Sequence, residues 1–353
     1  MRRFIYFVIC ICMVILFPSL LHCQEPYENG KYGYIDKSGK LVIQPQFDAA
    51  SLFSEDLAPV QVKGKFGYID KSGKIVIEPQ FIYAFLFSEG LASVCVNDES
   101  EPMGYKCGCI DKTNKFIIKP QSSYNFNFSE GLASMAIGNK TVFFDKTGKV
   151  AIETPFELAG DFSEGLALVC NSDDKCGYID KTGKVVIEPK FEHPNIGDFG
   201  YTASAFHEGL AVVCIDEKCG YIDKTGKVII EPKFEMVYPF SEGLAIADIN
   251  DKSGFIDKTG NIVIPPKFYK TDGFAEGLAA VQIDGKWGYI DRSGNIVIAP
   301  KYTDARNFSE GLACVMIDRK WGYIDKRGKV VIEFQFNEAG NFQEGLAPVV
   351  ISK

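Results

Sequence analysis

The chain has 353 residues and a mass of 39.1 kDa. Hydrophobic residues make up 46% and charged residues 24%, which is the composition of a folded protein rather than a disordered one. The formal charge of -8 argues against a basic face for nucleic acid, and three histidines leave little material for histidine-based catalysis or metal binding. We therefore expect no nucleic-acid partner and no metal or other cofactor.

The first 23 residues have the order of a secretory signal peptide. Two arginines give a basic start, residues 4–17 are almost purely apolar, and polar residues begin at Gln24. The apolar stretch is too short to favour a membrane-spanning helix, which needs about 20 residues. We predict export, with residues 1–23 as the signal and residues 24–30 as a leader.

Cys23 ends a segment, Leu20-Leu21-His22-Cys23, that resembles the cleavage box of bacterial lipoproteins. In that box the cysteine is acylated and becomes the first residue of the mature protein. A small residue usually precedes the cysteine, whereas His22 stands here, so ordinary cleavage and free release are the alternative. We expect contact with a membrane only through a lipid on Cys23, and a location in the cell envelope or outside the cell.

Nine copies of one motif account for residues 31–353. Aligned on Gly-Tyr-Ile-Asp-Lys, the aspartate recurs mostly every 34 residues, at positions 36, 70, 111, 145, 180, 223, 257, 291 and 325. A fixed period of this length indicates a repeat architecture in which each unit packs on its neighbours.

The clearest unit begins Gly285-Lys-Trp-Gly-Tyr-Ile-Asp-Arg-Ser-Gly-Asn-Ile-Val-Ile and continues downstream with Phe308-Ser-Glu-Gly-Leu-Ala. Such units resemble those of the WG-repeat (KWG-repeat) proteins, and the resemblance covers residues 31–353. Tryptophan stands only at positions 287 and 321, and the other units have Tyr, Phe, Cys, Ser or, in the fourth unit, Thr there. That family occurs mostly in bacteria and has no established common activity, so the resemblance implies architecture rather than function.

Each unit predicts a three-stranded meander. In the clearest one, residues 278–283 and 286–290 form two strands around Asp284-Gly285, a hairpin turn that needs positive φ at both positions. A type I turn closed by Gly294 follows, and then a third strand over residues 295–298, ended by Pro300.

Two turn glycines are replaced once each, by Asn114 and by Asp56. Both replacements tolerate left-handed geometry, so the two slots are predicted to have positive φ. The fourth unit departs further, because Val142 stands where the motif has glycine. We interpret Val142 as a tolerated variant rather than a kink in the array.

No segment shows helical periodicity, so we predict an all-β fold of nine tandem β-meander repeats of about 34 residues. Two arrangements are open. The units stack as an open solenoid, or they close into a propeller-like ring, whose blades usually have four strands. Three strands per unit, nine units and no sign of a strand exchanged between the termini favour the open solenoid.

Six cysteines stand at facing positions of the predicted hairpins, as the pairs Cys95 with Cys107, Cys170 with Cys176, and Cys214 with Cys219. Facing residues of a non-hydrogen-bonded antiparallel pair have Cα atoms about 4.5 Å apart, within reach of a disulfide. We predict three disulfides, which agree with export because such bonds persist in oxidising surroundings. Zinc binding is the weaker interpretation, since no histidine accompanies the pairs.

Two further cysteines, Cys109 and Cys314, have no repeat-related partner. We expect both to be buried free thiols.

An aspartate in the Tyr-Ile-Asp motif and a glutamate in the Ser-Glu-Gly-Leu motif recur in the units. Eighteen carboxylates in register could bind calcium or act in acid–base pairs, but a residue needed by every unit fits a structural role better. We expect the aspartate to cap its turn and the glutamate to cap or to pair with the lysine after the aspartate. We predict no catalytic residue, no metal site and no enzymatic activity.

Two inserts break the repeat and are free to carry specific contacts. The first, Asn97–Lys106, is acidic and enclosed by the predicted Cys95–Cys107 bond, and the second lies within residues 192–202. Tyr105, Phe199 and Tyr201 are the candidate contact residues. The alternative is that both inserts are merely tolerated loops.

Together these features predict an exported, monomeric, non-enzymatic scaffold that binds a protein or a glycan at the cell envelope or outside the cell. A purely structural spacer is the alternative. A hydrolase with a site between units would need an asymmetric polar cluster, and the sequence shows none.

Overall fold

The computed structural model describes residues 30–138, 140–192 and 204–351. The predicted signal peptide, Cys23, Phe199 and Tyr201 lie outside these residues. Every element named in the described part of the chain is a strand, which confirms the all-β prediction. In that part, no helix is long and apolar enough to cross a membrane.

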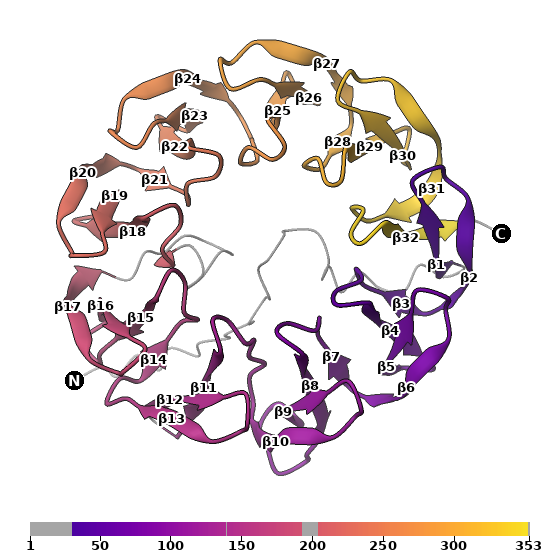
Figure 1. Ribbon diagram of the computed structural model, residues 1–353. Coiled ribbons are helices and arrows are strands. Elements are labelled where there is room, and N and C mark those ends of the chain that lie inside the picture. The colour runs from indigo at the N-terminus through magenta and orange to yellow at the C-terminus, as the bar shows by residue number, and fades with distance from the viewer. Residues whose placement is uncertain (1–29, 139, 193–203, 352–353) are drawn as a thin grey trace, which may run out of the picture.

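The strands form nine antiparallel blades that stand side by side around a ring (Figure 1). We number the blades along the chain: blade 1 is β3–β6, blade 2 is β7–β10, blade 3 is β11–β13, blade 4 is β14–β17, blade 5 is β18–β20, blade 6 is β21–β24, blade 7 is β25–β27, and blade 8 is β28 to the first part of β31. Blade 9 combines the end of β31, β32, β1 and β2.

Each blade has up to four strands from the centre of the ring to its rim. Five blades have a short innermost strand: β3 (Ala49–Ala50), β7 (Tyr83–Ala84), β14 (Leu158–Ala159), β21 (Met236–Val237) and β28 (Asp304–Ala305). The second strands are β4 (Leu57–Val62), β8 (Leu91–Asn97), β11 (Leu132–Ile137), β15 (Leu166–Cys170), β18 (Leu210–Ile215), β22 (Ala245–Ile249), β25 (Ala279–Ile283), β29 (Leu312–Ile317) and β32 (Leu346–Ile351).

The third strands carry the Gly-Tyr-Ile motif: β1 (Lys31–Asp36), β5 (Lys65–Asp70), β9 (Tyr105–Asp111), β12 (Lys140–Asp145), β16 (Lys175–Asp180), β19 (Lys218–Asp223), β23 (Lys252–Ile256), β26 (Lys286–Ile290) and β30 (Lys320–Asp325). The outermost strands are β2 (Leu41–Phe47), β6 (Ile75–Phe81), β10 (Phe116–Ser122), β13 (Val150–Glu153), β17 (Val185–Glu192), β20 (Val228–Phe234), β24 (Ile262–Phe268), β27 (Ile296–Tyr302) and β31 (Val330–Ala339).

The chain closes on itself, so the preference for an open solenoid is corrected in favour of the ring. Strand β1 pairs antiparallel with β32, from Lys31 opposite Ile351 to Asp36 opposite Leu346. The exchange between the termini is built into the repeat, because the chain begins in the third strand of a blade and ends in the second. The prediction of three strands per unit missed the innermost strand, which is too short to give a local signal.

Alternating strand directions divide the turns between two faces of the ring. The hairpins between second and third strands, such as Asp284-Gly285, share one face with the connections between blades, and we call it the hairpin face. The Ser-Glu-Gly turns and the Asp-Lys-Ser-Gly turns share the opposite face. The first insert, after β8, lies on the hairpin face. Residues 193–202 of the second insert lie outside the described residues.

The predicted turn geometry is confirmed. Asp284 and Gly285 have φ of 49° and 75°, and Gly294, Asn114 and Asp56 have φ of 81°, 66° and 69°. The third strand of the meander does not stop at Pro300, however, and β27 runs on to Tyr302. Proline is tolerated there because the outermost strand has no neighbour on its outer side.

Except in blade 3, each outermost strand bulges opposite the motif glycine. The register moves from Trp287 opposite Tyr302 to Tyr289 opposite Ile298, so extra residues of β27 crowd Gly288. A Cβ atom on Gly288 would lie 2.5 Å from the Ile298 carbonyl oxygen. In blade 3, where Val142 replaces this glycine, strand β13 is shorter and Val142 pairs directly with Glu153, so the variant removes the bulge without breaking the ring.

The core lies between the blades. In most blades the motif tyrosine or phenylalanine packs on the core phenylalanine of the next blade, as Tyr34 does on Phe53 with ring centroids 5.0 Å apart. Equivalent ring pairs recur at 4.8–5.0 Å in seven further junctions, whereas Cys109 stands at this slot in blade 2. The hydroxyl of Tyr34 also donates to the carbonyl of Ser51 in the next blade at 2.7 Å, and the other tyrosines at this slot fasten their blades in the same way.

Candidate functional site

The recurrent glutamates lie in strained turns that project toward the centre of the ring (Figure 1). All nine have positive φ, between 52° and 55°, although glutamate has no intrinsic preference for this region. Each is the first central residue of a two-residue turn, as in the reciprocal backbone bonds between Ser163 and Leu166 at 2.9 and 3.2 Å. Such a conformation persists only where the surroundings impose it.

The surroundings come from the next blade. Each glutamate carboxylate accepts a hydrogen bond from the backbone N–H at the glycine slot of the next turn, at 2.9–3.1 Å. Eight of the glutamates also pair with the motif lysine two repeats further on, at 2.9–3.2 Å. At the ninth position Arg292 donates to the carbonyl of Glu242 instead.

This interaction, which we call the glutamate latch, also passes across the chain ends. Glu344 accepts from Asp56 N at 3.0 Å and pairs with Lys71 at 3.0 Å. The recurrent aspartates are used locally, as Asp36 Oδ1 accepts from the backbone N–H of Ser38 at 2.9 Å and of Lys40 at 3.1 Å. The expected cap and the expected glutamate–lysine pair are both present, so the repeated carboxylates hold the ring together.

The pKa shifts follow from these contacts. The hydroxyl of Ser38 and nearby backbone N–H groups lower the pKa of Asp36. Partial burial acts to raise the pKa of Glu164, but the ion pair with Lys224 and the N–H of Gly209 outweigh it and leave that pKa below its ordinary value. In the described part of the chain, no three His, Cys, Asp or Glu side chains gather as a metal site would require.

The six paired cysteines face one another in the predicted register. The Cα atoms are 3.9 Å apart in Cys95–Cys107 and 4.1 Å apart in each of Cys170–Cys176 and Cys214–Cys219, and all three pairs are joined as disulfides. Cys109 and Cys314 are buried free thiols, and burial raises the pKa of each to about 12. Disulfides of this kind are typical of an oxidising environment.

The first insert is ordered by its own charges. Lys106 pairs with Asp98 and with Glu101, each at 3.1 Å. Ser100 and Lys106 lower the pKa of Asp98 to about 2. The hydroxyl of Ser123 donates to Glu101 at 2.8 Å, so the insert of blade 2 rests on the connection to blade 3.

Exposed large side chains border this insert. Tyr83, Met103 and Tyr124 are 37%, 47% and 39% exposed. Tyr105 packs edge-on against Tyr83 with centroids 5.3 Å apart, and its hydroxyl donates to Met103 Sδ at 3.7 Å. We call these four residues the aromatic ledge. The sequence singled out only Tyr105. Met103 lies in the same insert, whereas Tyr83 and Tyr124 lie outside the insert and are brought to it by the fold.

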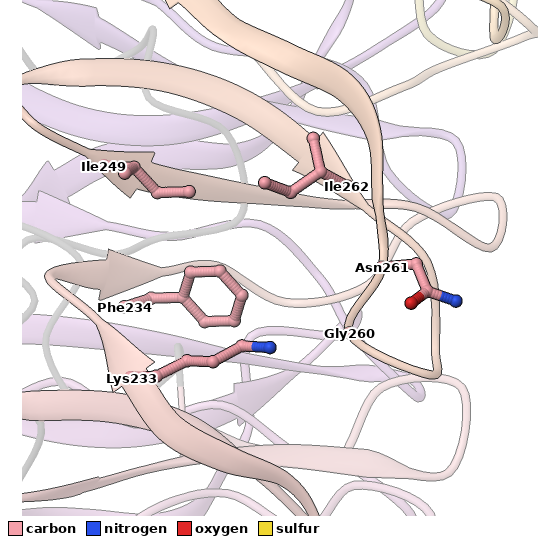
Figure 2. A pocket seen from close by; sticks show the side chains of 6 residues that line it. All are labelled: Lys233, Phe234, Ile249, Gly260, Asn261 and Ile262. Atoms are coloured by element: carbon pink, nitrogen blue, oxygen red, sulfur yellow. The ribbon is translucent and has the colours of Figure 1, made fainter.

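An open groove of about 430 Å³ lies at the junction of blades 5 and 6 (Figure 2). Lys233 and Phe234 lie on one side, and Ile249, Gly260, Asn261 and Ile262 lie on the other. Lys233 Nζ is 5.1 Å from the centre of the Phe234 ring, and the same pairing recurs at Lys190–Phe191, Lys267–Phe268 and Lys301–Tyr302. The groove is therefore a product of the repeat and not a specific site.

The family model described as "WG containing repeat" matches nine segments: residues 32–66, 66–99, 108–140, 143–176, 177–219, 220–252, 254–287, 287–321 and 321–353. No curated protein matches this sequence.

Among solved structures, one titled as the eukaryotic initiation factor has a TM-score of 0.58 and 14% identity, and the match covers 92% of this chain and 98% of that one. The computationally designed Ika8 protein has a TM-score of 0.48 and 11% identity, over 86% of this chain and 95% of that one. BamB from Moraxella catarrhalis has a TM-score of 0.44 and 10% identity, over 85% of this chain and 95% of that one. At these identities the likeness to the initiation factor concerns the fold alone.

The latch predicts a specific pH dependence. Glu164→Gln should lower the free energy of unfolding at pH 7 by roughly 0.5–1.5 kcal/mol, because a charge-assisted bond and a partly exposed ion pair are lost. Since the folded-state pKa of Glu164 is lowered, its contribution is complete above the ordinary glutamate pKa and disappears as pH falls through the folded value. Urea unfolding at pH 7 and at pH 3 measures the difference.

Glu188→Gln, on the exposed outer strand β17, is the matched control and should change stability little at either pH. A gap between wild type and Glu164→Gln that does not narrow from pH 7 to pH 3 would contradict the latch.

Proposed function

We propose that this chain, which belongs to the family of WG-containing repeat proteins, is an exported, non-enzymatic scaffold that binds a partner protein through the aromatic ledge. The repeat scaffold follows from the family and the fold. Export, partner binding and the absence of catalysis are the proposal.

Export is supported by two independent features. Residues 1–23 have the charge and hydrophobicity order of a signal peptide, and three short hairpins carry disulfides that an oxidising compartment preserves. Acylation of Cys23 would hold the ring on a membrane surface, whereas ordinary cleavage would release it. Both routes place the ring at the cell envelope or outside the cell.

Partner binding is supported chiefly by the aromatic ledge. Tyrosine and methionine are enriched at the centres of protein interfaces, where large side chains bury area at low entropic cost. The ledge is held from two sides, by the Cys95–Cys107 bond and by Lys106 between Asp98 and Glu101. A preorganised apolar surface loses little freedom on binding, which favours affinity.

A non-enzymatic role is supported by the use of the repeated carboxylates. The nine glutamates serve the latch, and the motif aspartates cap their turns. A purely structural spacer would use the same contacts but would have no need for an ordered, exposed ledge on one blade.

Export predicts a defined chemical state for protein taken from its native host. Non-reducing peptide mapping by mass spectrometry should find a mature N-terminus at or near Cys23 and the three linked pairs. A lipid on the Cys23 peptide would identify the anchored form. Reduced thiols together with an intact Met1 would contradict export.

The ledge predicts a site-specific partner contact. A photo-crosslinking residue at Met103, 47% exposed, should give one reproducible protein adduct in the native host. The control places the same group at Val297, which is 43% exposed on the outer strand of blade 7, and should not give that adduct. Loss of the adduct in Tyr83→Ala would connect it to the ledge.

Identical adducts from both positions, or none from Met103, would contradict a protein partner at the ledge. A ring that then still bound isolated cell-wall glycan would point to a glycan partner. A ring that bound neither would fit the spacer.

A further inference from the structure

Blade 3 differs from most of the ring at its inner edge. In seven blades, the backbone N–H two residues before the core phenylalanine donates to a carbonyl of the second strand at 2.9–3.1 Å, from Ser51, Phe85, Gly160, Tyr238, Asp272, Arg306 and Gly340. Phe126 holds this position in blade 3, and within the described residues it makes no such bond. Strand β12 is the one described strand that pairs with β11, so the inner edge of β11 has no neighbour.

A substitution in blade 2 explains why Phe126 leaves its own blade. Cys109 stands where most motifs have tyrosine, so no tyrosine ring lies beside the core Phe128. Phe126 takes the vacated space, since it is 5% exposed and packs in one cluster with Cys109 and Phe128. Its N–H donates to the hydroxyl of Ser93 in blade 2 at 3.5 Å, not to β11.

The residues just before Phe126 are also attached to blade 2 or to one another. Ser122 stands where the other units have phenylalanine or tyrosine, and its hydroxyl accepts from the backbone N–H of Tyr124 at 3.1 Å. The hydroxyl of Ser123 donates to Glu101 of the blade 2 insert at 2.8 Å. We call residues 122–126 the strap. Because the strap is held on blade 2, it does not cover β11.

The pairing of β11 with β12 shows which backbone groups are left open. Ala136 faces Thr141. The N–H of Thr141 donates to Phe156 at 2.9 Å and its carbonyl accepts from Thr154 at 3.3 Å, so both groups point outward. The N–H and carbonyl of Ala136 therefore point inward, and so does the carbonyl of Ser134, two residues earlier. None of these three groups has a hydrogen-bond partner among the described residues.

The inner edge of β11 is also reached by solvent. Ser134 is partly exposed, whereas the residues at its position in the other eight units are all buried: Pro59, Ser93, Leu168, Val212, Ile246, Ala280, Cys314 and Pro348. Ile137, at the end of the strand, is 42% exposed. An exposed strand edge with unpaired backbone groups is a template for a further strand.

We propose that an extended segment of the partner protein supplies the missing innermost strand of blade 3. The segment donates to the carbonyls of Ser134 and Ala136 and accepts from the N–H of Ala136, as in other cases of strand addition. This inference rests on the proposed partner at the aromatic ledge and states how that partner binds. Tyr124 belongs to the ledge and to the strap, at the position that Tyr83 holds in the innermost strand of blade 2, so the added segment lies beside the ledge.

The other blades indicate which side chain the segment carries. The five innermost strands end in a small apolar residue: Ala50, Ala84, Ala159, Val237 and Ala305. The residue that faces it on the second strand is valine in four blades and alanine in one. Met135 has this position in blade 3 and is 2% exposed. Since methionine is larger than valine, alanine is the residue that fits opposite it.

Hydrogen exchange of the mature ring, resolved to single amides, tests the edge without a partner. The N–H of Gln282 has the same position in blade 7 and donates to the carbonyl of Lys270 at 2.8 Å. The N–H of Ala136 should exchange at least about 100-fold faster than that of Gln282, because it has no bond to break. Equal exchange at the two amides would overturn the open edge.

A short peptide tests whether the edge accepts a strand. The probe is acetyl-Thr-Asp-Ala-Arg-Asn-amide, a copy of residues 303–307. At about 10 mM, a peptide with a dissociation constant of about 1 mM should slow exchange of the Ala136 amide about tenfold. The control peptide is methylated at the nitrogens that correspond to Thr303 and Arg306, which donate to the second strand in blade 8. Equal slowing by both peptides, or none by either, would overturn the strand addition.

A pair of proline variants connects the edge to the native partner. Ala136→Pro removes the inward N–H and should reduce the adduct from Met103 at least about tenfold. Gln282→Pro is the matched control at the same position in blade 7 and should leave the adduct unchanged. Thermal unfolding should show the smaller loss for Ala136→Pro, because only Gln282 has a hydrogen bond to lose.

The results separate this inference from the proposed function. An adduct from Met103 that Ala136→Pro leaves intact would overturn the strand addition and keep the ledge as the partner's site. Absence of the adduct would contradict the ledge and, with it, a partner that binds in this form.

Discussion

The structure depends on the junction between consecutive blades. A single blade is a small sheet that cannot bury both of its faces, so its stability comes from its neighbours. At most junctions a motif tyrosine or phenylalanine packs on the core phenylalanine of the next blade, and the tyrosine hydroxyl binds a carbonyl of its innermost strand. Tyr68, for example, is fully buried between Phe87 and the carbonyl of Phe85. This contact sets the rotation from one blade to the next, and nine such rotations complete the ring.

The glutamate latch adds a second connection at the centre. Because each glutamate contacts a turn glycine and a motif lysine of the next blade, a local change in one turn affects both blades of the junction. In these turns the glutamate backbone has positive φ, a conformation that would be unfavourable without the contacts of the latch. Residues that serve these junctions vary little between units. Differences between units are therefore found at positions outside these junctions, such as the insert Asn97–Lys106.

The sequence predicted the features that depend on neighbouring residues. The turn glycines and their replacements at Asn114 and Asp56 correctly indicated positive φ in the turns. The paired cysteines correctly indicated which residues of a hairpin face one another. The innermost strands were missed because residues such as Ala49–Ala50 pair over too short a length to show a period of two. Closure was only the alternative interpretation of the sequence, because it joins residues at opposite ends of the chain.

The ring closure is the central claim, and a crosslink tests it directly. Tyr32 faces Val350 across the β1–β32 pair, at the slots that hold Cys214 and Cys219 in blade 5. Tyr32→Cys combined with Val350→Cys should form a disulfide within one molecule, because facing residues at these slots lie 4.1 Å apart between Cα atoms in the native pair. The closed ring predicts a linked 32–350 peptide from monomeric protein. Thiols at 32 and 350 that remain reduced while the native pairs are oxidised, or links found only between molecules, would contradict the ring.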